Sequence, residues 1–394
     1  MTKPPTADYD PPAPVLPGGR IGLLGGGQLG RMFAIAARRM GYRVHALDPV
    51  ADCPAGQVAD VELNVPYDDV PAATEFATGV DVVTFEFENV PAETLDAVAA
   101  VRPVYPSPHV LHTCRHRLRE KRFLRDNDLP HADWREVDGP AATAEAVRAF
   151  GGGILKTAEF GYDGKGQTRL SADASAEDCQ AAWQRVGSPR VAVVEAVVPF
   201  ECELSVIIAR TRAGETATFS VGRNDHADGI LDVTTVPSGL PVDVEVAAKA
   251  LAERVAALLD LVGVLAVEMF PVGKNLLINE LAPRPHNSGH WTFDAAITSQ
   301  FEQQLRAVCN LPLGDPSATV GGVAMANLLG DLWQGGEPNW AEALKGPNVK
   351  LHLYGKKQAR PGRKMGHLVA VAATPEQAKR DVLAARAALQ PTIS

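Results

Sequence analysis

Two apolar segments in the second half of the chain restrict its fold most, because each is followed or interrupted by a lone glutamate. Residues 264–270 and 275–278 are typical of strands, and the Gly273-Lys274 turn between them predicts a hairpin. Glu268 and Glu280 can then point to the same face. A carboxylate among apolar neighbours is costly unless it is paired, hydrogen-bonded or bound to a cation. Two such carboxylates suit Mg²⁺ bound with a substrate polyphosphate. The alternative for Glu268 is a salt-bridged structural glutamate.

The segment that follows, residues 279–290, combines carboxylate, guanidinium, imidazole and amide groups in Asn-Glu-Leu-Ala-Pro-Arg-Pro-His-Asn-Ser-Gly-His. Two prolines and a glycine restrict its backbone path, so the polar side chains can converge instead of spreading along a helix. We therefore predict an active-site loop over these residues.

A second cluster lies around Lys156, at the end of the strand-like residues 151–156 and just before the glycine-rich residues 161–167. Glycine lets backbone N–H groups approach anionic oxygens, and lysine adds a positive charge. The pattern predicts a mobile flap that holds phosphates. It is not a Walker A loop, because no Gly-Lys-Ser/Thr opens a helix. An ordinary loop is the alternative.

A third segment, residues 191–208, reads as two apolar strands joined by an acidic kink that contains Glu201 and Glu203. In an ATP site such a kink can offer backbone groups to the adenine edge and a carboxylate to the ribose hydroxyls. Both contacts need acceptors, which this kink supplies.

The first 120 residues contain a motif that favours a rival function. Gly25, Gly27 and Gly30 match Gly-x-Gly-x-x-Gly after a strand, and Asp48 ends the next strand. A nicotinamide-dependent dehydrogenase is the function this motif suggests. A lone match is a weak signal, and a helix amino terminus binds a ribonucleotide 5′-phosphate for the same reason that it binds a pyrophosphate.

Alternating strands and helices predict a parallel, Rossmann-like α/β domain over residues 18–120. Residues 121–309 predict two α+β lobes. Residues 310–394 contain three more strand-like runs, typical of a small β-rich domain. Residues 1–17 carry six prolines, so we expect a disordered tail there.

Composition limits the partners of the chain. A net charge of -9 argues against nucleic acid and membrane surfaces, so anionic substrates must be held by local basic clusters. Five widely spaced cysteines without a Cys-x-x-Cys pair, and no apolar run of about 20 residues, indicate a cytoplasmic protein.

The order of Lys156, the glycine-rich flap, the acidic kink, Glu268 and Glu280 resembles the ATP-grasp fold. Longer strings resemble one ATP-grasp family closely, the 5-(carboxyamino)imidazole ribonucleotide synthetases. These strings are Gly-Gly-Gly-Gln-Leu-Gly-Arg-Met at 25–32, Thr-Phe-Glu-Phe-Glu-Asn-Val at 84–90 and Pro-Arg-Pro-His-Asn-Ser-Gly-His at 283–290. The resemblance covers roughly residues 18 to 375.

The resemblance implies the following residue roles. For ATP it implies Arg117, Lys156, Gly161, Tyr162, Asp163, Gly164, Lys165, Gly166, Gln167, Glu195, Ala196, Val197, Val198, Glu203, His226, Asn279 and Glu280. For the ribonucleotide it implies Gln28, Leu29, Glu88, Asn287, Lys356, Arg363 and Lys364. The catalytic set is Lys156, Arg284, His286 and Asn287, and the metal ligands are Glu268 and Glu280. Many ATP-grasp enzymes have an Asn-Glu-x-Asn metal motif, whereas Ala282 stands at its last position here.

The implied activity is carboxylation of the exocyclic amine of 5-aminoimidazole ribonucleotide in purine biosynthesis, with ATP, Mg²⁺ and bicarbonate and through carboxyphosphate. Arg284, beside Glu280, would contact bicarbonate or the γ-phosphate, and an ordinary ion pair is its alternative. A homodimer is expected. Another ATP-grasp carboxylase or a formate-using ribonucleotide transferase stays open, because these enzymes share the scaffold.

Overall fold

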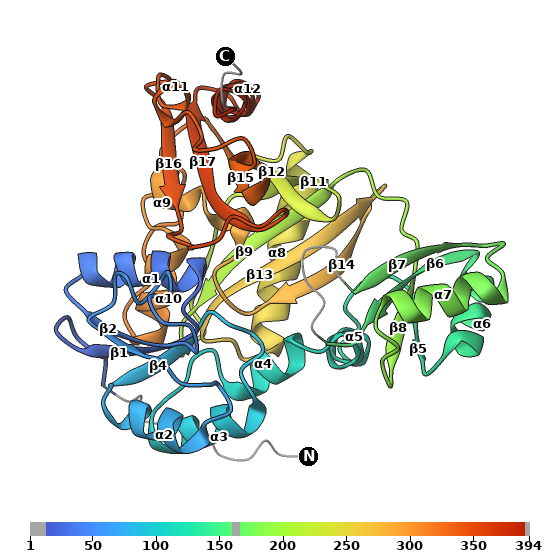
Figure 1. The fold of residues 1–394 in the computed structure, drawn as a ribbon, viewed down its shortest axis with the longest axis horizontal. Helices are drawn as coiled ribbons and strands as arrows, with labels where there is room; N and C mark the ends of the chain where they lie inside the picture. The colour runs from blue at the N-terminus through green and yellow to red at the C-terminus, as the bar shows by residue number, and fades with distance from the viewer. Residues whose placement is uncertain (1–12, 160–165, 391–394) are drawn as a thin grey trace.

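The computed structural model describes residues 13–159 and 166–390, which are built around three β-sheets (Figure 1). Part of the expected tail therefore lies outside the described residues, whereas Val15 is fixed by two hydrogen bonds. Its N–H donates to the Cys309 carbonyl, and its carbonyl accepts from the Tyr42 hydroxyl. Within the described residues, no helix has the length and apolar character needed to cross a membrane.

The amino-terminal sheet is parallel, as the alternating pattern predicted. Its strand order is β3-β2-β1-β4, with β1 (Arg20–Leu24), β2 (Arg43–Leu47), β3 (Val61–Leu63) and β4 (Val82–Phe85). Its helices are α1 (Gln28–Arg39), α2 (Val70–Thr78), α3 (Ala92–Val101) and α4 (Pro108–Cys114). Apolar clusters cover both faces of the sheet, which is the condition that parallel sheets require.

The small second sheet is antiparallel, in the order β5-β8-β6-β7, and stands to one side of the molecule (Figure 1). It contains β5 (Trp134–Val137), β6 (Gly152–Thr157), β7 (Gln167–Ser171) and β8 (Ala192–Ala196). Helices α6 (Pro140–Phe150) and α7 (Ala176–Arg185) bury one of its faces. Helix α5 (Arg117–Asp126) connects this part to the amino-terminal sheet.

The large sheet has nine strands, eight of them in the order β14-β13-β9-β11-β12-β15-β17-β16, with β10 paired to β9. They are β9 (Glu203–Arg210), β10 (Thr216–Thr218), β11 (Gly222–Ala227), β12 (Ile230–Val236), β13 (Gly263–Val272), β14 (Asn275–Ala282), β15 (Gly322–Leu329), β16 (Val349–Leu353) and β17 (Lys364–Ala372). The remaining helices are α8 (Val242–Leu258), η1 (Asn287–Gly289), α9 (Thr292–Ala295), α10 (Gln300–Val308), η2 (Gly330–Trp333), α11 (Trp340–Ala343) and α12 (Pro375–Ala387).

The predicted β13-β14 hairpin is confirmed, with its turn at Gly273 and Lys274. The three carboxy-terminal strands are confirmed as well, but they do not form a sheet of their own. Strand β15 pairs with β12, so the hydrogen-bonded ladder crosses the expected boundary at residue 309. Strands β13 and β14 therefore belong to the same sheet as β15, β16 and β17.

Candidate active site

Two carboxylates meet on the β13-β14 hairpin. Glu268 and Glu280 are direct cross-strand partners, so both side chains leave the sheet on the same face, as predicted. Burial, together with the neighbouring carboxylates of Glu280 and Glu203, raises the pKa of Glu268 to about 8. Three carboxylates in one place need positive charge, and Arg117 supplies part of it, at 3.9 Å from Glu280.

The predicted active-site loop begins later than expected. Residues 279–282 are part of β14, because their backbone groups pair with β13, and the loop itself covers residues 283–290. Within it, Nε2 of His286 lies 3.6 Å from Oε1 of Glu268. Burial, then the nearby charges of Arg284 and Lys364, lower the pKa of His286 well below its usual value. The imidazole is therefore neutral at physiological pH.

The tautomer of His286 follows from its neighbours. The backbone N–H of Ser288 donates to Nδ1 of His286 at 3.3 Å, and a backbone N–H can only donate. Nδ1 is therefore the acceptor and Nε2 carries the proton. His286 thus presents an N–H donor toward the carboxylate face of the hairpin.

Arg284 forms an ion pair, which was the alternative left open for it beside a contact to bicarbonate or the γ-phosphate. Its Nε lies 2.8 Å from Oε1 of Glu88. Burial raises the pKa of Glu88 and the Arg284 cation opposes that shift. This ion pair joins the loop after β14 to the segment after β4, so it connects the hairpin with the amino-terminal domain.

Lys156 lies at the centre of a buried charge cluster. Its Nζ is 2.9 Å from Oε2 of Glu195, and Nζ of Lys121 is 3.5 Å from the other oxygen. Burial alone would raise the pKa of Glu195, but Lys121, Lys156 and Arg117 outweigh it and hold the value at about 2. The Glu195 side chain therefore faces the lysines.

Helix α5 contributes two more charged residues to this region besides Arg117. Lys121, four residues after Arg117, does not lie on a solvated face of the helix, because its side chain is 0% exposed. Its Nζ donates to the Asn279 carbonyl at 3.1 Å. Glu120, which sequence reasoning missed, accepts from the Leu281 N–H at 2.9 Å. The buried Leu118 and Leu124, three residues on either side of Lys121, were the signal that this face is internal.

Glu203 and His226 lie on the paired strands β9 and β11, near the lysine cluster. Oε2 of Glu203 is 3.1 Å from Nδ1 of His226. Burial raises the pKa of Glu203 to about 7, and Lys156 opposes the shift.

The predicted flap residues 161–165 lie outside the described residues. Of the rest of the flap, the Gly166 carbonyl accepts from Thr157 and Gln167 starts β7.

The glycine motif of the first domain binds a carboxylate. Oε1 of Glu86 accepts from the Gly27 N–H at 2.6 Å, and Asp48 accepts from the Gly26 N–H at 2.7 Å. A phosphate at the start of α1 would meet the negative charge of Glu86, so the dehydrogenase interpretation loses its main support. Sequence reasoning assigned no role to Glu86, although it stands beside Glu88. Leu29 is buried in the apolar core, so only its backbone can face a ligand.

The proposed phosphate-binding residues gather between β16 and β17. Nζ of Lys356 donates to the Lys364 carbonyl at 2.7 Å, and Arg363 donates to the Gln358 carbonyl at 3.0 Å. The amide of Gln57, from the first domain, donates to the Gly355 carbonyl at 3.0 Å. The turn therefore lies against the amino-terminal domain. Gln28, at the first position of α1, is on that side as well.

Asn287 is held by a residue that sequence reasoning did not single out. Its Nδ2 donates to Asn327 of β15 at 3.0 Å, and Asn327 donates back at 2.7 Å. Both side chains are buried. This reciprocal amide pair fixes η1 against the large sheet.

A divalent cation fits the hairpin face. Among the described residues, no group of three or more histidine, cysteine or acidic side chains is arranged as a metal site. Two carboxylates supply only part of the coordination shell of Mg²⁺, and oxygens of the substrate phosphates can supply the rest. Oδ1 of Asn279 is buried there without a hydrogen-bond partner. Burial raises the pKa of Glu268, so a bound cation would favour its ionised form.

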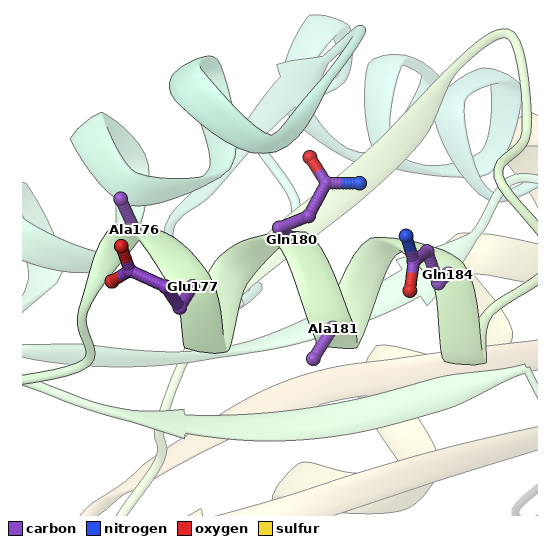
Figure 2. Close-up of a pocket in the computed structure, with 5 residues that line it drawn as sticks. All are labelled: Ala176, Glu177, Gln180, Ala181 and Gln184. Carbon is purple, nitrogen blue, oxygen red and sulfur yellow. The ribbon is translucent and has the colours of Figure 1, made fainter.

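A shallow surface hollow on α7 is separate from these groups. Figure 2 shows the five residues that line it, all on one helix: Ala176, Glu177, Gln180, Ala181 and Gln184. These side chains are exposed and none belongs to the charge cluster.

Three family models cover most of the chain. Residues 122–301 match the ATP-grasp domain, residues 19–115 the ribonucleotide synthetase preATP-grasp domain, and residues 323–381 the phosphoribosylaminoimidazole carboxylase C-terminal domain. The fold and the site thus define an ATP-grasp ligase, which is an ATP-dependent enzyme.

Comparison with individual proteins shows to which family of ATP-grasp ligases the chain belongs. N5-carboxyaminoimidazole ribonucleotide synthase of Brucella melitensis is 46% identical over 357 residues, which cover 90% of this chain and 97% of that protein. The chain belongs to the N5-carboxyaminoimidazole ribonucleotide synthase family. A solved ADP complex of such a synthetase is 40% identical with a TM-score of 0.89, covering 95% of this chain and 98% of that one. The Aspergillus clavatus synthase bound to ADP and 5-aminoimidazole ribonucleotide is 30% identical with a TM-score of 0.85, covering 94% and 98%.

Proposed function

We propose that this chain carboxylates the exocyclic amine of 5-aminoimidazole ribonucleotide to give 5-(carboxyamino)imidazole ribonucleotide in purine biosynthesis, using ATP and bicarbonate. The observation that carries the proposal is the position of one carboxylate pair, Glu268 and Glu280, between a lysine cluster and the Arg284-His286 loop. The family relatives support it through their names and through the complex with ADP and the ribonucleotide.

In this proposal ATP lies between the small sheet and the β13-β14 hairpin. Lys156, Arg117 and the flap contact its phosphates, and Glu203 with His226 contacts its ribose. The backbone of residues 195–198 faces the adenine. Because the N–H of Ala196 already donates to the Asp133 carbonyl at 2.8 Å, the base would use other backbone groups of this segment.

Glu268 and Glu280, with Asn279 beside them, would hold Mg²⁺. When bound, the ion neutralises the phosphate oxygens during transfer of the γ-phosphoryl group. The two carboxylates also orient the neighbouring side chains, since Glu280 lies by Arg117 and Glu268 lies by His286.

A bicarbonate oxygen would attack the γ-phosphorus while the bond to the β-phosphate breaks and ADP leaves, and the carboxyphosphate formed would be held by Arg284 and by the Nε2–H of His286. Both groups donate to anionic oxygen, so they stabilise the charge that develops in the transfer. The amine of the ribonucleotide then captures the carboxyl group, and phosphate leaves. Glu88, paired with Arg284, would stand beside the ribonucleotide, with Asn287 near its ribose.

The remaining ribonucleotide contacts come from the first domain and the β16-β17 turn. Gln28 and the backbone of Leu29 would face the nucleotide, whereas Lys356, Arg363 and Lys364 would bind its phosphate. The hydrogen bond from Gln57 to the Gly355 carbonyl supports this placement, because it brings the two surfaces together.

ADP release tests the proposed function. The protein should form ADP in step with product when ATP, Mg²⁺, bicarbonate and 5-aminoimidazole ribonucleotide are all present. Product with glycinamide ribonucleotide and formate would instead identify a formate-using transferase. The expected homodimer can be measured separately by sedimentation.

We expect Glu203→Ala to weaken ATP binding by about 1.5–3 kcal/mol, the usual value of hydrogen bonds to a charged group. Isothermal calorimetry at pH 8 measures this, since the carboxyl, with a pKa of about 7, is then largely ionised. Glu201→Ala, a change of an exposed carboxylate in the same kink, is the control. Unchanged ATP affinity in a folded Glu203→Ala protein would refute the ribose contact.

We expect Arg363→Ala to raise the Michaelis constant for the ribonucleotide strongly and to leave the constant for ATP nearly unchanged. A phosphate gains charge-assisted hydrogen bonds from this guanidinium, and binding energy from a remote group also orients the reacting amine. The unphosphorylated nucleoside should be a poor substrate and should lose little further in the variant. If the constants for ATP and ribonucleotide rise together, Arg363 does not bind the substrate phosphate.

A further inference from the structure

Helix α10 buries three glutamines, Gln300, Gln303 and Gln304, each at most 1% exposed. A buried amide is stable only when its donors and acceptor have partners. Here each amide bonds to an element outside the helix. Gln303 binds Gly314, and Gln304 accepts from the Val264 N–H at the start of β13.

Gln300 binds both backbone groups of His286. Its Oε1 accepts from the His286 N–H at 2.9 Å, and its Nε2 donates to the His286 carbonyl at 2.8 Å. This is the donor and acceptor pattern that a neighbouring strand would provide. The same Nε2 lies 3.3 Å from Nδ1 of the buried His290. One side chain therefore fixes the backbone of the loop on both sides of His286.

The surrounding residues leave room for this arrangement. A Cβ atom at Gly289 would lie 2.4 Å from Oε1 of Gln300, so a larger residue would displace the amide. The Thr292 hydroxyl donates to the Gly289 carbonyl at 2.7 Å and accepts from the Gln300 N–H at 3.0 Å. The end of the loop at Gly289 is thus attached through Thr292 to the start of α10.

We propose that Gln300 is a positioning residue that sets the His286 imidazole at the Glu268 face. The proposal rests on the role given above to His286. Gln300 itself contacts only protein groups, and its effect on turnover acts through the His286 backbone. With both bonds in place, the Nε2–H of His286 reaches the face where carboxyphosphate would form.

A matched pair of variants tests the proposal. Gln300→Met removes the two bonds to His286 while nearly keeping the side-chain volume. Gln303→Met removes an equivalent pair on the same helix, in which Gln303 donates to the Gly314 carbonyl at 2.6 Å and accepts from the Gly314 N–H at 3.0 Å. Both proteins should lose similar thermal stability. Only Gln300→Met should lose kcat, by up to about 10²-fold, with the Michaelis constant for ATP nearly unchanged.

A double variant separates positioning from general damage. If Gln300 acts only through His286, then His286→Ala combined with Gln300→Met should be no slower than His286→Ala alone. A further loss of kcat in the double variant, equal losses of kcat in the two methionine variants, or normal kcat in Gln300→Met would each overturn the proposal. If Gln300→Met fails to fold, Gln300→Glu, which keeps the acceptor for the His286 N–H, replaces it.

The same measurements distinguish this inference from the proposed function. Normal turnover in His286→Ala would show that His286 has no part in the reaction, and both statements about it would fall. Impaired turnover in His286→Ala with normal turnover in Gln300→Met would overturn only the role of Gln300.

Discussion

Turnover of Glu280→Gln should fall by at least about 10²-fold, a loss of about 2.7 kcal/mol of transition-state stabilisation. Glutamine keeps the shape of the side chain but removes one of the two negative charges that face each other across β13 and β14. Those charges would bind Mg²⁺, so the Mg²⁺ concentration needed for half-maximal rate should rise as well. Steady-state ADP formation over a series of Mg²⁺ concentrations measures both effects.

The control for this variant is Glu342→Gln, which removes a carboxylate that pairs with Lys345 near α11, outside the proposed site. It should keep normal turnover and normal Mg²⁺ dependence. Near-normal activity in Glu280→Gln would rule out the carboxylate pair as the metal site. A loss of rate without any change in Mg²⁺ dependence would assign Glu280 to the Arg117 contact instead.

Lys121→Met should lower the free energy of unfolding by about 3–5 kcal/mol, the usual cost of removing one partner of a buried ion pair. Its ammonium group is fully buried and binds both Glu195 and the Asn279 carbonyl. Without it, one oxygen of the buried Glu195 carboxylate loses its cation and β14 loses one of its links to α5. Denaturant unfolding and the melting temperature measure the effect.

Arg122→Met is the control on the same helix. Arg122 pairs with Glu136 at 2.6 Å, but both side chains are nearly half exposed, so its loss should cost no more than about 1 kcal/mol. Equal destabilisation by the two variants would contradict the importance of the buried cluster.

The β13-β14 hairpin and the parallel amino-terminal sheet could be predicted because the signals are local. Residues 264–270 and 275–278 are apolar runs around a glycine turn. The register counted from that turn would put Asn279 opposite Glu268, and a β-bulge between Glu268 and Met269, which the sequence does not signal, brings Glu280 into that position instead. The family strings added residue roles, which stay predictions until they are tested.

The contacts between distant segments could not be predicted in this way. The leucines near Lys121 indicate an internal helix face, but its partners, Glu195 of β8 and Asn279 of β14, come from strands far along the chain. Asn327 and Gln300 lie 40 and 14 residues from their partners, within segments whose patterns indicate only a strand and a helix. The β11-β12 hairpin was missed because β11 is polar, although the Asp228-Gly229 turn and the β-branched residues of β12 are local hairpin signals.

The unbroken large sheet limits which substrates the protein can accept. The carboxylates on β13 and β14 that are proposed to hold Mg²⁺ and the cations beside β17 are joined through a continuous series of strand ladders. Their separation is therefore a fixed length. We expect selectivity for the span between the reacting amine and the phosphate to come from the backbone itself. An analogue with one extra methylene in that span should bind either at its amine end or at its phosphate end, and substitution of single side chains should not restore its turnover.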